Sequence, residues 1–157
     1  MQAIIHWGSV AVLCGLLIVA AIGDIRRFII PNWLNAAVAL LVVPFWLTSA
    51  EIGWATVGWQ LLTAGCVLML FGGLFAAGWM GGGDVKLLVA LALWLPWLLF
   101  LRMFLVIAVL GGLLTAALLI AHRVRKREGT PEIPYGVAIA VGAILTFGEP
   151  LVKHLAG

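Results

Sequence analysis

The chain has 157 residues, of which 65% are hydrophobic and only 10% are charged, with a formal net charge of +3. Because a soluble domain carries about 25% charged residues, this composition excludes a protein that folds in water under a polar surface. The apolar stretches lack the alternation of roughly ten-residue barrel strands, which favours membrane-spanning helices. The basic residues lie in short loops without interleaved aromatic residues, so the charge does not indicate nucleic-acid binding.

Six apolar segments are expected to span the membrane, since about 20 apolar residues cross a bilayer. In chain order they cover residues 3–23, 31–50 and 54–80, then a long stretch from 85 to 121, and finally 134–152 after a polar loop. Pro96 and Arg102 indicate that the long stretch is split into a short helix over 85–98 and another over 103–121. The sequence thus predicts an all-α membrane protein, a single domain over residues 1–157 built as a bundle of about six transmembrane helices.

The Lys and Arg residues of the short loops predict the orientation of this bundle. The loops of one side carry Arg26, Arg27, Lys86, Arg123, Arg125, Lys126 and Arg127, and the other side carries Arg102 and Lys153. We therefore expect the first side to be cytoplasmic, with both termini outside. The expected location is the inner (cytoplasmic) membrane of the cell, which the chain crosses several times.

Two aspartates are expected on the cytoplasmic side at similar depth. Asp24 ends the first helix, and Asp84 opens the fourth within the stretch GGGDVK, residues 81–86. Each has a purely structural alternative: Asp24 can pair with Arg26 or Arg27, and Asp84 can cap its helix. As a pair, two carboxylates titrate apart, so one takes a proton from water while the other donates one to a peptide carbonyl. This chemistry needs neither a metal nor a cofactor.

The surroundings of the two acids carry two further expectations. The glycines before Asp84 are expected to let a substrate strand approach and to adopt positive φ angles, although close helix packing is an alternative role for them. Helix position predicts which acid holds the proton, because a helix N-terminus favours an anion. Asp84 is therefore expected to be ionised and Asp24 to be protonated.

Three blocks of the sequence resemble the type IV prepilin peptidases, which belong with the GxGD intramembrane aspartyl proteases. They are GD at 23–24 followed by RRFIIPNWLN, GGGDVKLL at 81–88, and IPYGVAIAVG at 133–142. The resemblance covers essentially the whole chain, and it implies that Asp24 and Asp84 are the two catalytic aspartates. The other positions that match family motifs are Gly81, Gly83, Lys86, Pro31, Asn32, Pro134, Tyr135 and Gly136.

The resemblance implies an aspartic-type endopeptidase that removes the leader of prepilin-like or preflagellin-like proteins after a glycine, at the cytoplasmic membrane edge. The implied partners are a substrate with a basic leader and an apolar helix, and membrane lipid. Many members carry a preceding region with a cysteine tetrad that is associated with N-methylation. Cys14 and Cys66 could not form such a tetrad, so the chain resembles the short, peptidase-only members, and methyl transfer is not expected.

The competing hypothesis is a non-enzymatic protein, a small transporter subunit or a membrane scaffold. It predicts a polar path and broken helices at the membrane midplane, whereas the acids here are expected at the edges. Lys86 has two open roles, since it can anchor its helix at the headgroups or bias the ionisation of Asp84. The basic loop 122–128 can bind anionic lipid, and Glu128 and Glu132 can help to receive a basic leader.

Overall fold

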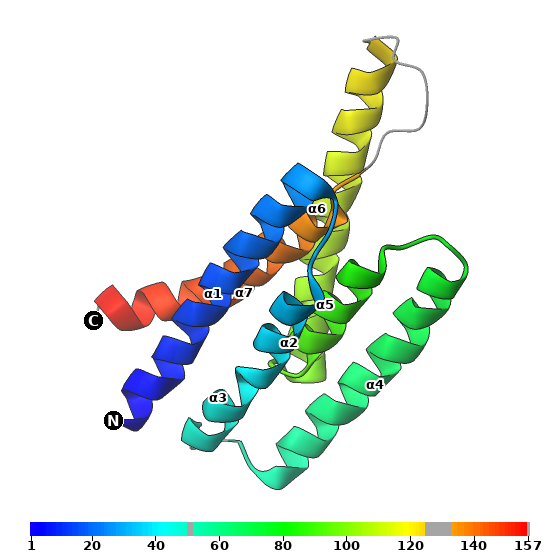
Figure 1. Ribbon diagram of the computed structural model, residues 1–157. Coiled ribbons are helices and arrows are strands. Elements are labelled where there is room, and N and C mark those ends of the chain that lie inside the picture. The colour runs from blue at the N-terminus through cyan, green and yellow to red at the C-terminus, as the bar shows by residue number, and fades with distance from the viewer. Residues whose placement is uncertain (50–51, 125–132, 157) are drawn as a thin grey trace.

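The structure is a computed structural model, and it describes residues 1–49, 52–124 and 133–156. Every regular element in these ranges is a helix, which confirms the predicted all-α class (Figure 1). The loop residues Arg125, Lys126, Arg127, Glu128 and Glu132, for which the sequence suggested contacts with lipid or leader, lie outside the described ranges. The helices are α1 (Gln2–Arg27), α2 (Asn32–Leu40), α3 (Val42–Thr48), α4 (Trp54–Ala76), α5 (Gly82–Ala92), α6 (Trp97–Val124) and α7 (Tyr135–Ala156).

Within the described ranges, four helices are long and apolar enough to cross a membrane: α1, α4, α6 and α7. The protein is therefore a helical membrane protein, as predicted. The expected six spans also counted two shorter stretches, which are Asn32–Thr48, formed by α2 and α3, and the 11-residue α5. A helix of 11 residues is about 16 Å long, whereas the hydrocarbon core measures about 30 Å. By itself α5 is thus too short to span.

The predicted split of the stretch 85–121 is present, but it lies slightly earlier than expected. α5 ends at Ala92, and α6 begins at Trp97, directly after Pro96. Proline lacks an N–H and restricts the residue before it, so it separates two helices and favours the start of the second. Arg102 does not interrupt the chain and lies inside α6.

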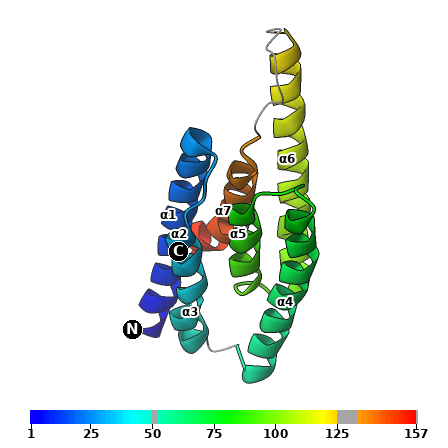
Figure 2. The same cartoon turned by 45° about the vertical axis from the view of Figure 1, so that its right-hand side comes forward.

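α5 lies at the centre of the bundle, in contact with α2, α4, α6 and α7 (Figures 1 and 2). α1 and α7 pack along each other on one side, and α6 packs against α7. The fully buried Trp94 follows α5 and donates its Nε1–H to the carbonyl of Val38 at 3.0 Å. Because this donor has no access to water, the hydrogen bond fixes the end of α5 to α2.

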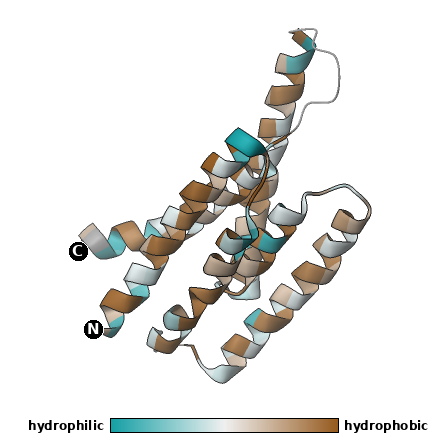
Figure 3. Cartoon of the chain, viewed as in Figure 1, coloured by the Kyte–Doolittle hydropathy of each residue, from teal (hydrophilic) through white to brown (hydrophobic). Residues whose placement is uncertain are grey.

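The helix ends expected to share the cytoplasmic side do lie toward one side of the bundle. The C-terminal ends of α1, α4 and α6 and the N-terminal ends of α2, α5 and α7 lie toward the top of Figure 1, and both chain termini lie away from them. Figure 3 shows mostly hydrophobic helices with hydrophilic residues at the upper ends of α1 and α6. Large apolar side chains cover the outside, among them Ile18, Leu40, Met69 and Leu105, as expected of a surface that faces lipid.

Candidate active site

Asp24 lies near the C-terminal end of α1, where its side chain is only 5% exposed. Its Oδ2 accepts a hydrogen bond from the backbone N–H of Val137 at 3.3 Å. Val137 belongs to the first turn of α7, where N–H groups have no partner in the helix and the dipole favours negative charge. The carboxylate of Asp24 therefore occupies an anion position at the start of α7. Within the described ranges neither Arg26 nor Arg27 forms an ion pair with it.

Gly136 allows this close approach of α1 to α7. A Cβ atom at position 136 would lie 2.8 Å from Asp24 Oδ2 and 2.7 Å from Ile30 Cδ1, closer than real Cβ contacts. Pro134 directly precedes α7, and its carbonyl shares the N–H of Val137 with the Asp24 carboxylate, at 3.2 Å. Of the predicted motif residues, Pro134 and Gly136 thus belong to the surroundings of Asp24.

Tyr135 belongs to the same motif, but its side chain is directed toward α6. Its hydroxyl accepts a hydrogen bond from Thr115 Oγ1 at 3.4 Å. Its ring also packs beside Gly111, where an added Cβ would lie 3.7 Å from Tyr135 Cδ1. Tyr135 therefore links the start of α7 to α6 and is not directed at either acid.

Asp84 lies in the first turn of α5 and is half-buried. Its carboxylate folds back over Gly81, where an added Cβ would lie 3.0 Å from Asp84 Oδ2. α5 is not one of the four spanning helices. Two causes raise the pKa of Asp84 to about 7, and these are first its burial and second the charge of Asp24. A carboxyl group with this pKa is about half protonated at pH 7, so the raised pKa argues against the expectation that Asp84 is the ionised member.

Ile30 lies beside the starts of both α5 and α7 and is itself 5% exposed. An added Cβ at Gly83 would lie 3.1 Å from Ile30 Cβ and 3.2 Å from its carbonyl oxygen, and Gly136 packs against the end of the same side chain. The segment after α1 is thus held between the GxGD turn and α7. The structure in this way brings the three sequence blocks together, with Asp24 near enough for its charge to act on Asp84.

The expectation that the glycines of the GxGD turn adopt positive φ angles is wrong. In the described chain the positive-φ residues are Phe28, which ends α1 with φ 52°, and Gly78, with φ 76°. Gly81 is extended, with φ −70°. The glycines instead supply space, because an added Cβ at Gly82 would lie 3.0 Å from the ring of Phe75, and Gly81 and Gly83 face Asp84 and Ile30.

Comparison with known proteins shows the family of the chain. The type IV leader peptidase family matches residues 11–116, a range that contains both Asp24 and Asp84. The chain belongs to the type IV leader peptidase family. The resemblance inferred from the three blocks is thereby confirmed.

Three relatives carry the name prepilin leader peptidase/N-methyltransferase. The protein of Burkholderia pseudomallei (strain K96243) is 34% identical over 151 residues, which cover 92% of this chain and 48% of the relative. The proteins of Bacillus subtilis (strain 168) and Pectobacterium carotovorum subsp. carotovorum are each 30% identical, over 90% and 88% of this chain and 56% and 50% of their own lengths. The chain thus spans about half the length of these relatives. No solved structure matches it.

Lys86 and Asn32, two further positions predicted from the motifs, bind each other. Lys86 Nζ donates to Asn32 Oδ1 at 2.7 Å on the surface and joins α5 to α2. Pro31 occupies the N-cap position of α2, where its carbonyl accepts from the N–H of Leu34 at 3.1 Å. Burial and the charge of Asp24 are the causes of the raised Asp84 pKa, and Lys86 is not among them. The hydrogen bond of Lys86 indicates a third role beside the two left open by the sequence, which is to join α5 to α2.

Asn35 is a polar residue of the site that the sequence analysis missed. It is 5% exposed, and its Nδ2 donates to the carbonyl of Gly83 at 3.3 Å. Its buried Oδ1 has no partner among the described residues. An amide on an apolar helix, one turn after Asn32, is the signal that could have revealed it, because buried polar groups are normally hydrogen-bonded. Asn35 fixes the GxGD turn to α2.

The cysteines do not contribute to this site. Cys14 lies on α1 and Cys66 on α4, and both are free thiols. In the part of the chain that the structure describes, no group of three or more His, Cys, Asp or Glu side chains could hold a metal ion. The groups found at the candidate site are the two carboxyl groups and the backbone N–H of Val137.

Proposed function

We propose that this chain is an aspartic-type peptidase that removes the leader of prepilin-like proteins by means of Asp24 and Asp84. The observation that carries the proposal is the placement of the Asp24 carboxylate at the start of α7, with Asp84 near enough for the charge of Asp24 to raise its pKa. Membership of the type IV leader peptidase family and the names of the relatives support the reaction and the class of substrate.

In the proposed mechanism Asp24 is the base and Asp84 is the acid. Asp24 takes a proton from water as the water oxygen attacks the peptide carbonyl carbon, while Asp84 gives its proton to the carbonyl oxygen. The resulting tetrahedral species then collapses. Its C–N bond breaks as Asp24 passes the proton it took to the leaving nitrogen and Asp84 takes back a proton from one hydroxyl group, which yields a carboxylic acid, an amine and the starting state of both acids. No bond forms between enzyme and substrate.

The proposed orientation places both acids at the cytoplasmic membrane edge of the inner membrane. The side that carries Asp24 and Asp84 also carries Arg26, Arg27 and Lys86, and an excess of such residues marks the cytoplasmic side. Both termini then lie outside, and α2–α3 and α5 return the chain to the outer side between the four spanning helices. The leader is cut after a glycine at this edge. The transporter or scaffold alternative has less support, because the two acids lie at helix ends.

The test of the proposal is cleavage by the purified protein in liposomes. We expect it to cut a prepilin-like substrate in the presence of a metal chelator, with a new N-terminus detected by mass spectrometry directly after the leader glycine. A substrate whose glycine is replaced by a bulky residue is the matched control. If the protein leaves both substrates intact while the natural substrate is cut by a known prepilin leader peptidase in the same liposomes, the proposed function is wrong.

The cleavage rate is expected to fall as the pH rises through about 7, the pKa of Asp84. The sign follows from the role of the group: Asp84 must hold a proton to act as the acid, so activity is present below its pKa and is lost above it. Single-turnover rates measured on both sides of this pH, in detergent so that the site meets the buffer, check this prediction. A rate that increases through the same range would contradict the assignment of Asp84 as the acid.

A further inference from the structure

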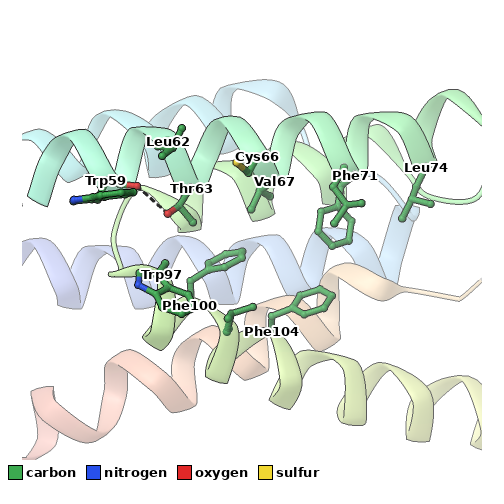
Figure 4. A pocket seen from close by; sticks show the side chains of 12 residues that line it. Trp59, Leu62, Thr63, Cys66, Val67, Phe71, Leu74, Trp97, Phe100 and Phe104 are labelled. Carbon is green, nitrogen blue, oxygen red and sulfur yellow. Dashed lines mark hydrogen bonds between the residues drawn. The ribbon is translucent and has the colours of Figure 1, made fainter.

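A groove of about 620 Å³ separates α4 from α6 (Figure 4). Its walls are aliphatic and aromatic, and no charged side chain lines it. Thr63 adds little polarity, because its hydroxyl donates to the carbonyl of Trp59 on the same helix at 2.8 Å. Trp59 and Trp97 lie at one end of the groove, and tryptophan is enriched at membrane interfaces. The groove is thus suited to an apolar segment that lies within the bilayer.

The groove adjoins a second cavity near the start of α7. Phe71 of α4 and Phe104 of α6 meet edge to face, with ring centroids 5.4 Å apart. Both rings line the groove, and both also line a second cavity of about 170 Å³ that reaches Tyr135. Tyr135 precedes Gly136, the residue against which the Asp24 carboxylate packs. An apolar path therefore leads from the groove to the start of α7.

The length of the groove favours a helical occupant. On α4 its lining residues extend from Trp59 to Leu74, a helical distance of about 22 Å. This is most of the hydrocarbon thickness of about 30 Å that a spanning helix crosses. A lipid chain could cover any apolar surface, but only a substrate has to place the end of an apolar helix beside Asp24 and Asp84.

We propose that the groove between α4 and α6 binds the apolar helix of the prepilin-like substrate and so positions the preceding peptide bond at the acid pair. This inference rests on the proposed function. Helices in lipid are held together by close van der Waals packing. A groove offers a substrate helix more of this contact than a convex helix surface does. The Phe71–Phe104 pair is the contact that the substrate meets between the groove and the site.

The first test fills the groove and compares two substrates. We expect Cys66→Trp to lower kcat/KM for a substrate with its apolar helix by about tenfold or more, because a bulky ring occupies the binding surface. A shortened peptide, which keeps the leader and the cleavage site but lacks the helix, should be cut at an unchanged rate. Met69→Trp is the matched control, since Met69 is 82% exposed on the same helix and does not line the groove.

The outcomes separate the groove from the proposed function. Equal rates for Cys66→Trp and Met69→Trp on the long substrate would contradict substrate binding in the groove. A loss of activity of Cys66→Trp on both substrates would also contradict it, because such a loss would indicate damage to the site. If the unmodified protein cut neither substrate, the result would instead contradict the proposed function. A second measurement uses the thiol of Cys66 in a variant that carries both Cys14→Ser and Asp84→Asn. Cys66 should cross-link to single cysteines placed along one face of the substrate helix, and no cross-link at any position would overturn the groove.

Discussion

Replacing either Asp24 or Asp84 by asparagine is expected to abolish cleavage while leaving the helical bundle folded. Asparagine keeps the shape of the side chain, and an oxygen at position 24 can still accept the N–H of Val137. It cannot take the proton of water, however, and at position 84 it cannot supply the acid proton. Because general acid–base catalysis contributes about 10²- to 10⁴-fold for a single group, we expect each variant to lose at least about 1,000-fold in rate.

The measurement is single-turnover cleavage, with circular dichroism and thermal unfolding in detergent to confirm that each variant folds. Glu149→Gln is a suitable control, because this acid is exposed on α7 and pairs with Lys153, at the end of the helix remote from Asp24. We expect it to retain normal activity. Near-normal turnover by Asp24→Asn or Asp84→Asn would show that the two aspartates are not the reacting pair.

Gly136→Ala is expected to reduce cleavage by about 100-fold, because a misplacement of about 1 Å at an active site has effects of this size. The added methyl group would lie 2.8 Å from Asp24 Oδ2 and 2.7 Å from Ile30 Cδ1. To relieve these contacts the Asp24 carboxylate or α7 has to shift, which separates the carboxylate from the N–H of Val137. Such overpacking also lowers the free energy of unfolding by about 1–3 kcal/mol.

Two further variants make this test specific. Gly15→Ala places a methyl group on α1 where no atom lies within 4 Å, so it controls for the loss of glycine in a helix. Ile30→Val combined with Gly136→Ala removes the Cδ1 atom of one contact, and we expect it to recover part of the stability but little of the activity. Normal cleavage by Gly136→Ala would mean that the contact between Asp24 and α7 is not needed.

The sequence was sufficient to predict which segments come together at the candidate site. Helical membrane topology places the end of the first long helix and the start of GGGDVK on one side, and the three motif blocks lead to the same residues. The structure brings these blocks together around Ile30. The break near Pro96 was also predicted correctly, because proline acts locally on the backbone.

The protonation of the pair could not be predicted from helix position. Sequence alone places Asp24 at the end of one helix, where the dipole disfavours an anion. The packing of α1 against α7 instead supplies the N–H of Val137, a residue 113 positions away. The space-filling role of the glycines and the bond from Asn35 to Gly83 likewise depend on tertiary contacts. Such contacts are set by the fold and leave little trace in local sequence.

The claim on which the mechanism depends is that the resting pair holds its proton on Asp84. Infrared difference spectroscopy in the carbonyl region tests it most directly, because a protonated carboxylic acid absorbs apart from a carboxylate. At a pH below 7, where Asp84 is protonated, we predict that the protonated-acid band is lost in Asp84→Asn and retained in Asp24→Asn. Loss of the band in Asp24→Asn with retention in Asp84→Asn would contradict the account and reverse the roles of acid and base.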